Sequence, residues 1–231
     1  LDIFGIPYAD PEYVRSEFGE DVRDFDSAHC YLLERIEAQR QPGRPTLLMS
    51  HCFVDGGTAS DSERPLTLGG AESVAWEPMQ GFDYVALGHL HGPQIRGGEH
   101  IRYSGSLLKY SFSEATQRKG VTLVEVGSEG VTQIAHHPLL PRRDVRVLEG
   151  ELAQLLAQGA ADPHADDYLL VRLTDRHAIL DPMGKLREIY PNILHLEKPG
   201  MLEAKGRQQL DRERLAFSAL DMFSDFFTQT S

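Results

Sequence analysis

The chain has 231 residues, of which 41% are hydrophobic, and a formal net charge of −12. This length fits one large domain or two small ones. So negative a charge argues against a protein that coats nucleic acid without specificity, and no apolar run reaches the roughly 18 residues of a membrane span. Two cysteines, Cys30 and Cys52, fit a reducing, cytoplasmic compartment and no disulfide framework.

The first fifty residues predict a strand, two helices and a second strand. Residues 1–8 form the first strand, residues 10–18 a short helix, and Asp26 is the predicted N-cap of a helix that extends through Gln39. After the turn at Pro42-Gly43, the apolar run 45–51 predicts a strand that ends in His51. A helix that leads into a buried strand is typical of a βαβ unit, and therefore of an α/β protein.

A second apolar run, Tyr84–Leu87, stops at Gly88 and is followed by His89 and His91. Side chains two residues apart on an extended backbone point the same way, so these two imidazoles are expected to reach one small volume. If the strands that end at His51 and Gly88 are parallel, all three histidines share the carboxyl edge of the sheet, where ligands of α/β proteins bind. Neutral imidazole binds transition metals, although the spacing alone also fits two surface histidines in a turn.

The rest of the chain predicts a change of architecture. Residues 53–70 are expected to be a long loop over the site, and Asp61 and Glu63 within it are not favoured as metal ligands. From residue 101 onward the apolar period becomes two, which predicts antiparallel strands that complete the sheet, with a hairpin turn at 127–130. A boundary near residues 138–141 precedes an α+β pattern of helix, strand, helix and strand, and residues from 202 onward predict a helix.

Longer strings around the histidines resemble a known family. The strings are SDSERP at 60–65, ALGHLHGPQ at 86–94, RYSGS at 102–106, and the stretch that continues to Glu114. They are similar to the SbcD nucleases of bacterial SbcCD complexes, which are calcineurin-like metallophosphoesterases, and the likeness covers nearly the whole chain. The resemblance implies the C-terminal part of the metallophosphoesterase β-sandwich flanked by helices at 1–140, a small α+β capping domain at 141–200, and a helical, partner-binding tail at 201–231.

The resemblance also implies a dinuclear site with two Mn²⁺ ions, or Mg²⁺ in their place. In it His51 and His89 bind one metal and His91 binds the other, and binding weakens below about pH 6.5 because the imidazoles must be neutral. The family's remaining carboxylate ligands and its acid/base histidine lie in Asp-x-His, Gly-Asp and Gly-Asn-His-Asp motifs that this sequence does not have in place. The chain is therefore expected to be a C-terminal part without a catalytic acid of its own.

DNA and an SbcC-type ATPase coiled coil are the partners that the resemblance implies, with a homodimer as a further option. Residues 88–120 carry five basic and two acidic side chains, and candidate DNA contacts are Arg64, Arg102 and Lys109. An apolar stripe in the tail is the candidate surface for the ATPase, although it also fits docking on the protein's own core: Phe217, Leu220, Phe223 and Phe227. Two alternatives stay open, namely a cyclic-nucleotide phosphodiesterase and a non-catalytic module that only binds the ATPase.

Overall fold

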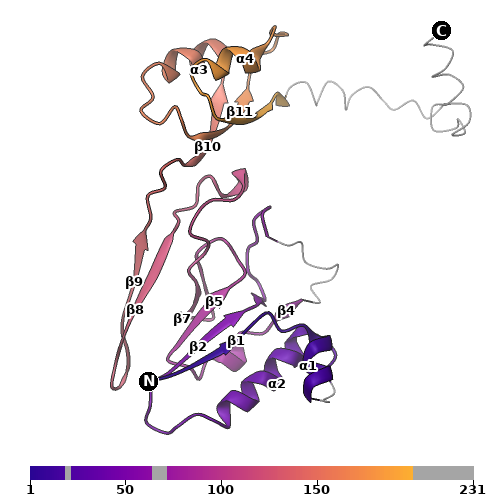
Figure 1. The fold of residues 1–231 in the computed structure, drawn as a ribbon, viewed down its shortest axis with the longest axis vertical. Coiled ribbons are helices and arrows are strands. Elements are labelled where there is room, and N and C mark those ends of the chain that lie inside the picture. Colours follow the sequence, from indigo (N-terminus) through magenta and orange to yellow (C-terminus); the bar gives the residue numbers. More distant parts are fainter. Residues whose placement is uncertain (19–21, 64–71, 200–231) are drawn as a thin grey trace, which may run out of the picture. The chain divides into compact units, whose positions relative to one another are not determined.

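The computed structural model describes residues 1–18, 22–63 and 72–199 (Figure 1). The chain divides into two compact units, Leu1–Arg146 and Val147–Ser231. The architecture is mixed α/β with several sheets, which confirms the predicted α/β class. None of the helices in these ranges is long and apolar enough to cross a membrane.

The first unit is built on a five-stranded sheet with the order β1-β2-β5-β7-β6. The first four strands in that order are parallel, and the edge strand β6 runs antiparallel to β7. Their bounds are β1 Asp2–Ile6, β2 Thr46–His51, β5 Tyr84–Gly88, β7 Gly98–Tyr103 and β6 Gln94–Arg96. The apolar runs at 45–51 and 84–87 thus form neighbouring parallel strands, as buried runs of that length favour.

The hairpin after this sheet does not complete it, contrary to the prediction. Strands β8 (Gly120–Gly127) and β9 (Gly130–Pro138) pair antiparallel in a separate two-stranded sheet, with the turn where it was predicted. The predicted loop at 53–70 also contains structure, because β3 (Phe53–Val54) pairs in parallel with β4 (Ser73–Val74). Two short 3-10 turns, Glu77–Met79 and Phe112–Glu114, connect these elements.

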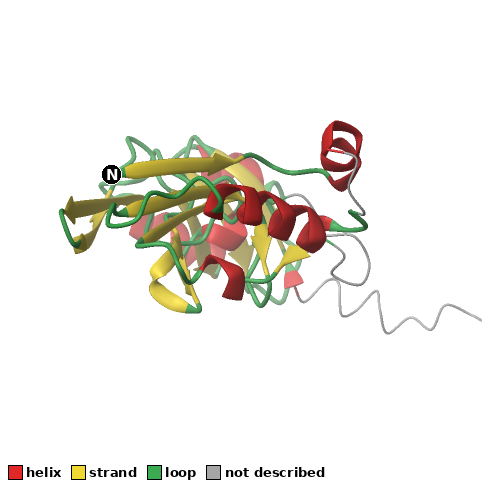
Figure 2. Cartoon of the chain, turned by 90° about the horizontal axis from the view of Figure 1, so that it is seen from below, coloured by secondary structure: helices red, strands yellow, loops and turns green. Residues whose placement is uncertain are grey.

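Two helices precede β2. Helix α1 spans Pro11–Phe18, and α2 spans Phe25–Glu37 and runs alongside the strands of the sheet (Figures 1 and 2). The N-cap of α2 is Asp24 and not the predicted Asp26: Asp24 accepts from Ser27 N at 2.8 Å, while Ser27 Oγ accepts from Asp24 N at 3.0 Å. This reciprocal capping box satisfies two donors at the start of the helix. Asp26 instead accepts a hydrogen bond from Ala75 N, 2.8 Å away.

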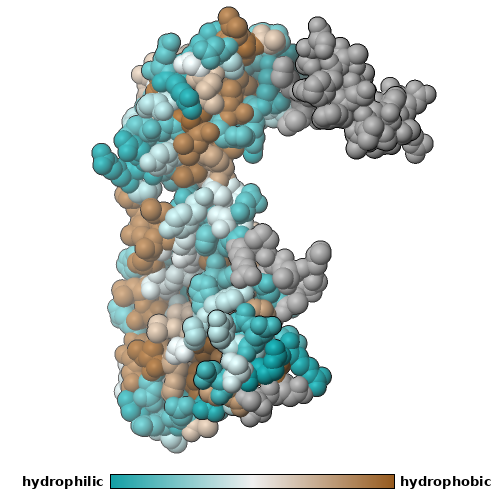
Figure 3. Space-filling model, turned by 45° about the vertical axis from the view of Figure 1, so that its right-hand side comes forward, coloured by the Kyte–Doolittle hydropathy of each residue, from teal (hydrophilic) through white to brown (hydrophobic). Residues whose placement is uncertain are grey.

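The two faces of the large sheet differ in burial. On one face Leu48, Val85 and Ile101 lie in register across three strands and are fully buried. On the other, Ile3 is 57% and Met49 is 53% exposed. Hydrophobic residues therefore reach the surface, and brown areas are visible among teal ones in Figure 3. One face of this sheet supplies the main core, and the other remains partly open.

The second unit has the α+β pattern that the sequence predicts. Its sheet has the order β10-β11-β12, and two helices pack with it. The bounds are β10 Val145–Gly150, α3 Leu152–Gly159, β11 Tyr168–Leu173, α4 Pro182–Arg187 and β12 Ile193–Glu197. Helix α4 is capped by Asp181, which accepts from Gly184 N at 3.0 Å. The predicted tail helix lies outside the described residues.

Candidate metal centre

His51 and His89 come together at the carboxyl edge of the large sheet. His51 ends β2, Gly88 ends β5, and these two residues are directly paired in the parallel register. His89 follows Gly88, so its ring approaches that of His51: the ring centroids are 5.5 Å apart at an interplanar angle of 83°. Parallel strands bring their carboxyl ends to one edge, and here that geometry places two imidazoles side by side.

Gly88 and Tyr8 form the walls of this histidine pair. A Cβ at Gly88 would lie 3.0 Å from His51 Nδ1, so the absence of a side chain there lets the His51 ring approach β5. The Tyr8 ring stacks on His89 at 6.1 Å and 11°, and it meets His51 edge-on at 6.2 Å. The two imidazoles are therefore held between a glycine and an aromatic face.

His89 has an unusual backbone and an unsatisfied ring nitrogen. Its φ of 112° is rare for a residue with a side chain, so the backbone is not extended there and the predicted strand-like alternation of His89 and His91 is wrong. His89 Nε2 is buried and has no hydrogen-bond partner among the described residues. Burial lowers the pKa of His89, as does nearby His51, whereas Glu63 has the opposite effect. The ring is thus favoured in its neutral form.

His91 occupies a different environment, in which most of its polar atoms have partners. Its Nδ1 lies 2.7 Å from Ser62 Oγ and 3.3 Å from Glu114 Oε1. Its backbone N donates to Glu63 Oε1 at 2.5 Å. Its carbonyl oxygen accepts from Lys119 Nζ at 2.8 Å and from Ser106 N at 3.0 Å. We call these groups, Ser62, Glu63, Ser106, Glu114 and Lys119, the His91 cradle.

A buried ion pair lies at the centre of the His91 cradle. Lys119 Nζ is 2.5 Å from Glu114 Oε2, and the two side chains are only 4% and 0% exposed. Burial alone would raise the pKa of Glu114, but hydrogen bonds from Lys119 and Ser62, together with the Lys119 charge, lower it to about 2. Glu114 is therefore a carboxylate at neutral pH and acts only as an acceptor.

The predicted DNA-contacting cations have different surroundings. Arg102 is partly exposed and its Nε donates to Glu99 O at 2.8 Å. Lys109 is only 10% exposed and donates to Asp144 Oδ2 at 2.8 Å and to Ala115 O at 2.7 Å, so a phosphate would have to compete with an ion pair. Part of the basic excess at 88–120 is thus neutralised internally, by Asp144 and by Glu114. Arg64 lies outside the described residues, as do the predicted partner-binding residues Phe217, Leu220, Phe223 and Phe227.

The histidines fit part of a metal site. An imidazole pair beside an aromatic ring, with a buried nitrogen that has no partner in the described part of the chain, has the donor chemistry of a transition-metal ligand set. Within the described ranges, no group of three or more His, Cys, Asp or Glu side chains is arranged to hold a metal ion. His51 and His89 could therefore supply two ligands to one ion and His91 one ligand to another, and further ligands would have to be added to complete either shell.

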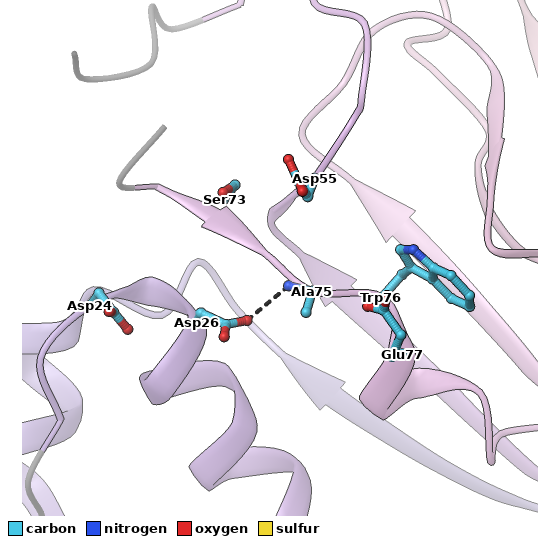
Figure 4. A pocket seen from close by; sticks show the side chains of 7 residues that line it. All are labelled: Asp24, Asp26, Asp55, Ser73, Ala75, Trp76 and Glu77. Atoms are coloured by element: carbon cyan, nitrogen blue, oxygen red, sulfur yellow. Dashed lines mark hydrogen bonds between the residues drawn. The ribbon is translucent and has the colours of Figure 1, made fainter. Parts of the chain in front are cut away.

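A separate hollow of about 470 Å³ lies near the start of α2 (Figure 4). It is lined by Asp24, Asp26, Asp55, Ser73, Ala75, Trp76 and Glu77, and Asp26 is bonded to the backbone of Ala75 within it. Four carboxylates repel a phosphate backbone. This hollow contains none of the predicted site histidines and is not suited to DNA.

The sequence does not predict the contacts that four residues make with the site histidines: Tyr8, Glu63, Glu114 and Lys119. The sequence pattern assigns Tyr8 to the end of a strand, Lys119 to the surface charge, and Glu63 only to the disfavoured ligands. Glu114 enters only as part of a family-like string. The available signal is that Glu114 and Lys119 are close in the sequence and opposite in charge, which allows an ion pair but does not indicate that the pair is buried.

Two comparisons with known proteins bear on the family of this chain. Residues 141–231 match the family described as the Type 5 capsule protein repressor C-terminal domain, SbcD_C. The chain is also 36% identical, over 197 residues, to the SbcD subunit of the nuclease SbcCD from Staphylococcus epidermidis, a match that covers 85% of this chain and 53% of the relative. The chain thus spans about half the length of this relative. These likenesses place the chain in the SbcD family.

Proposed function

We propose that the protein acts as the nuclease subunit of an SbcCD-type complex and hydrolyses phosphodiester bonds at DNA ends or hairpins during double-strand-break processing in the cytoplasm. Mn²⁺ is the proposed metal, with Mg²⁺ as a substitute, and an SbcC-type ATPase is the proposed partner. Membership of the SbcD family supports this proposal, because the relative in Staphylococcus epidermidis is named a nuclease and a subunit of SbcCD.

The observation that carries the proposal is the histidine pair at the sheet edge. Two imidazoles from neighbouring parallel strands lie 5.5 Å apart, and the Nε2 atom of His89 is buried without a protein partner in the described part of the chain. An unsatisfied buried nitrogen costs free energy unless a ligand completes it. A divalent cation is the ligand that imidazole nitrogens at such an edge are suited to bind.

The proposed roles of the residues follow from their positions. His51 and His89 hold one cation and His91 holds a second, while Tyr8 and Gly88 fix the orientation of the first two rings. Two bound cations would supply an activated water and would neutralise the charge that develops on the phosphate oxygens. Arg102, and Arg64 and Lys109 where they are accessible, would attract the DNA backbone.

The second unit and the tail have proposed roles beyond the chemistry. The first unit is proposed to be part of a calcineurin-like sandwich, in which the family's Asp-x-His, Gly-Asp and Gly-Asn-His-Asp motifs supply the remaining ligands and the acid/base histidine. Residues 141–200, which lie within the SbcD_C match, are proposed to form a capping domain that helps select DNA. The phenylalanine stripe at 217–227 is proposed to bind the coiled coil of the ATPase.

A manganese titration of the folded chain tests the proposal. Free Mn²⁺ is followed by electron paramagnetic resonance as it is added to the wild type, to His89→Gln and to His137→Gln, with cleavage of linear duplex DNA measured alongside. We expect saturable Mn²⁺ binding by the wild type, at least tenfold weaker binding by His89→Gln, and no change for His137→Gln. His137 is an exposed strand residue, so its replacement controls for nonspecific binding by surface imidazoles.

Two results would contradict the proposal. The first is the absence of Mn²⁺ binding by a wild-type chain that circular dichroism shows to be folded. The second is equal binding by the wild type and His89→Gln, which would place the metal elsewhere. Circular dichroism of each variant shows whether a loss of binding reflects the site or the fold.

A further inference from the structure

We infer that Glu114 is a positioning residue that, together with Lys119 and Ser62, fixes the His91 ring as its Nδ1–H tautomer and so leaves Nε2 available to a divalent metal. This inference rests on the proposed function, because it deepens the role of His91 in that site. It is carried by the hydrogen bonds and burial of the His91 cradle.

The first step concerns Glu114. Its Oε2 faces two donors, Lys119 Nζ at 2.5 Å and Tyr110 N at 3.3 Å. Its Oε1 faces His91 Nδ1 and accepts from the hydroxyls of Ser60, Ser62 and Ser111. The ion pair fixes the orientation of the carboxylate, because a turn of Oε2 away from Lys119 would leave a buried lysine without its anionic partner. Loss of such a partner is strongly destabilising. Oε1 is thereby held as an acceptor beside the histidine.

The second step assigns the hydrogens. A serine hydroxyl carries one hydrogen, and that of Ser62 is donated to Glu114 Oε1. Ser62 Oγ lies 2.7 Å from His91 Nδ1 and can therefore only accept from it. Glu114 Oε1, 3.3 Å from the same nitrogen, is also an acceptor. Both neighbours of Nδ1 thus require a hydrogen on it, and a neutral ring then carries its lone pair on Nε2.

The third step concerns the backbone of His91. Its N–H is held by Glu63 and its carbonyl by Lys119. The same ammonium that orients Glu114 thus also fixes the loop from which the ring extends. The His91 side chain is 25% exposed, whereas Glu114 is fully buried beneath it. His91 thus contacts a buried carboxylate and is also partly open to solvent. Metal-binding histidines commonly donate their second ring N–H to a carboxylate, which orients the ring.

Replacement of Glu114 by glutamine makes a sharp test. Lys119 and Tyr110 N need an acceptor, so the amide oxygen is expected to take the position of Oε2 and the NH₂ group that of Oε1. The NH₂ group would then donate toward Ser62 and His91 Nδ1, which favours a lone pair on Nδ1 and a hydrogen on Nε2. Glu114→Gln is therefore predicted to reverse the tautomer and to block the nitrogen that would bind the metal.

The experiment is a ¹H–¹⁵N correlation spectrum of the histidine rings in the metal-free chain at about pH 8, where imidazole is neutral. The His91 signal is assigned by its loss in His91→Gln. Asp144→Asn is the matched control, because it removes the partner of Lys109, 2.8 Å away, from another ion pair of the same unit. We expect Nδ1–H in the wild type and in Asp144→Asn, and Nε2–H in Glu114→Gln.

Mn²⁺ titration of the same three proteins gives the second readout. Binding is expected to weaken about 10–100-fold in Glu114→Gln and to stay unchanged in Asp144→Asn. An Nε2–H ring in the wild type, or an Nδ1–H ring that persists in Glu114→Gln, would overturn the inference, and the wild-type spectrum decides even if the variant does not fold. If the tautomer reverses as expected but the wild type binds no Mn²⁺, the positioning role stands and the proposed metal function fails.

Discussion

His89 and His91 lie within one short motif, yet different interactions hold them in place. His51 and His89 are placed by the register of two parallel strands, and His89 Nε2 has no partner in the described residues. His91 is placed by hydrogen bonds to its ring, its N–H and its carbonyl, with a buried ion pair at their centre.

This difference shows that the spacing of two histidines in the sequence does not determine which interactions position each side chain. A sheet edge positions the pair through backbone geometry and leaves a nitrogen unsatisfied. The cradle positions a single ring through charge, and its cost is a lysine and a glutamate removed from water. The stability of the region around the pair should therefore depend on protonation of the neighbouring His29. The stability of the cradle should depend on the Glu114–Lys119 ion pair and on the space around the His91 backbone.

The largest effect is expected from Lys119→Met. It leaves the Glu114 carboxylate buried without its cation and should lower the free energy of unfolding by about 3–5 kcal/mol. Urea denaturation measures the loss, with Lys109→Met as the comparison. Asp144, the partner of Lys109, is 36% exposed and can be solvated, so that variant should lose less. Equal losses would mean that the cradle is no more dependent on its ion pair than an ordinary partly exposed site.

The second prediction concerns the buried residue His29. Its Nε2 is hydrogen-bonded at 2.8 Å to the Oγ of Ser50, the residue directly before His51. Desolvation lowers the pKa of His29 to about 4, against the opposing charge of Asp26. The unfolded chain therefore binds the proton more readily, so stability is present above pH 6.5 and is lost as the pH falls toward 4, by about 3 kcal/mol. Unfolding of the wild type and His29→Gln at pH 7 and pH 4 measures this contribution.

In that comparison His29→Gln should lose less stability between the two pH values than the wild type. His137→Gln, which replaces an exposed histidine, should keep the wild-type dependence. An identical pH dependence in all three proteins would show that protonation of His29 does not contribute to the pH dependence of stability.

The third prediction compares two glycines in the left-handed region, and the smaller of its two effects is the smallest expected here. Gly105 has φ +80°, and a Cβ there would lie 2.6 Å from His91 O and 3.0 Å from Pro93 N, whereas Gly43 has φ +76° and open space around it. Gly43→Ala should cost about 1 kcal/mol from backbone strain alone. Gly105→Ala should cost about 1–3 kcal/mol more, because backbone atoms of the cradle must move. Similar midpoints in urea for the two variants would contradict a tightly held His91 backbone.

Much of the fold followed from local patterns. The apolar runs at 45–51 and 84–87 predicted two strands, and the structure shows that they are parallel neighbours. Burial on both faces, which such runs suggest, is not observed for β2, where Met49 is exposed. The hairpin turn at 127–130 and the α+β order of the second unit followed from turn residues and periodicity. These features depend on residues close together in the chain.

Errors arose where distant residues decide the outcome. Asp26 was predicted as the N-cap of α2, but Asp24 and Ser27 form the capping box. The carboxylate of Asp26 instead accepts a hydrogen bond from the backbone N–H of Ala75. Strands β8 and β9 pair only with each other, whereas β1 and β6 form the edges of the large sheet, and no local pattern distinguishes these two outcomes. The positive φ of His89, whose ring packs against Tyr8 and His51, likewise has no signal in the neighbouring residues.

The α/β class, the strand that ends in His51 and the likeness to SbcD nucleases follow from the residues alone. Tertiary contacts place His51 beside His89, leave His89 Nε2 without a partner in the described residues, and hold His91 with Glu114 and Lys119. The physical reason is that hydrophobic periodicity is a local property of the chain, whereas burial of an ion pair and the hydrogen bonds of a ring depend on groups up to tens of residues away.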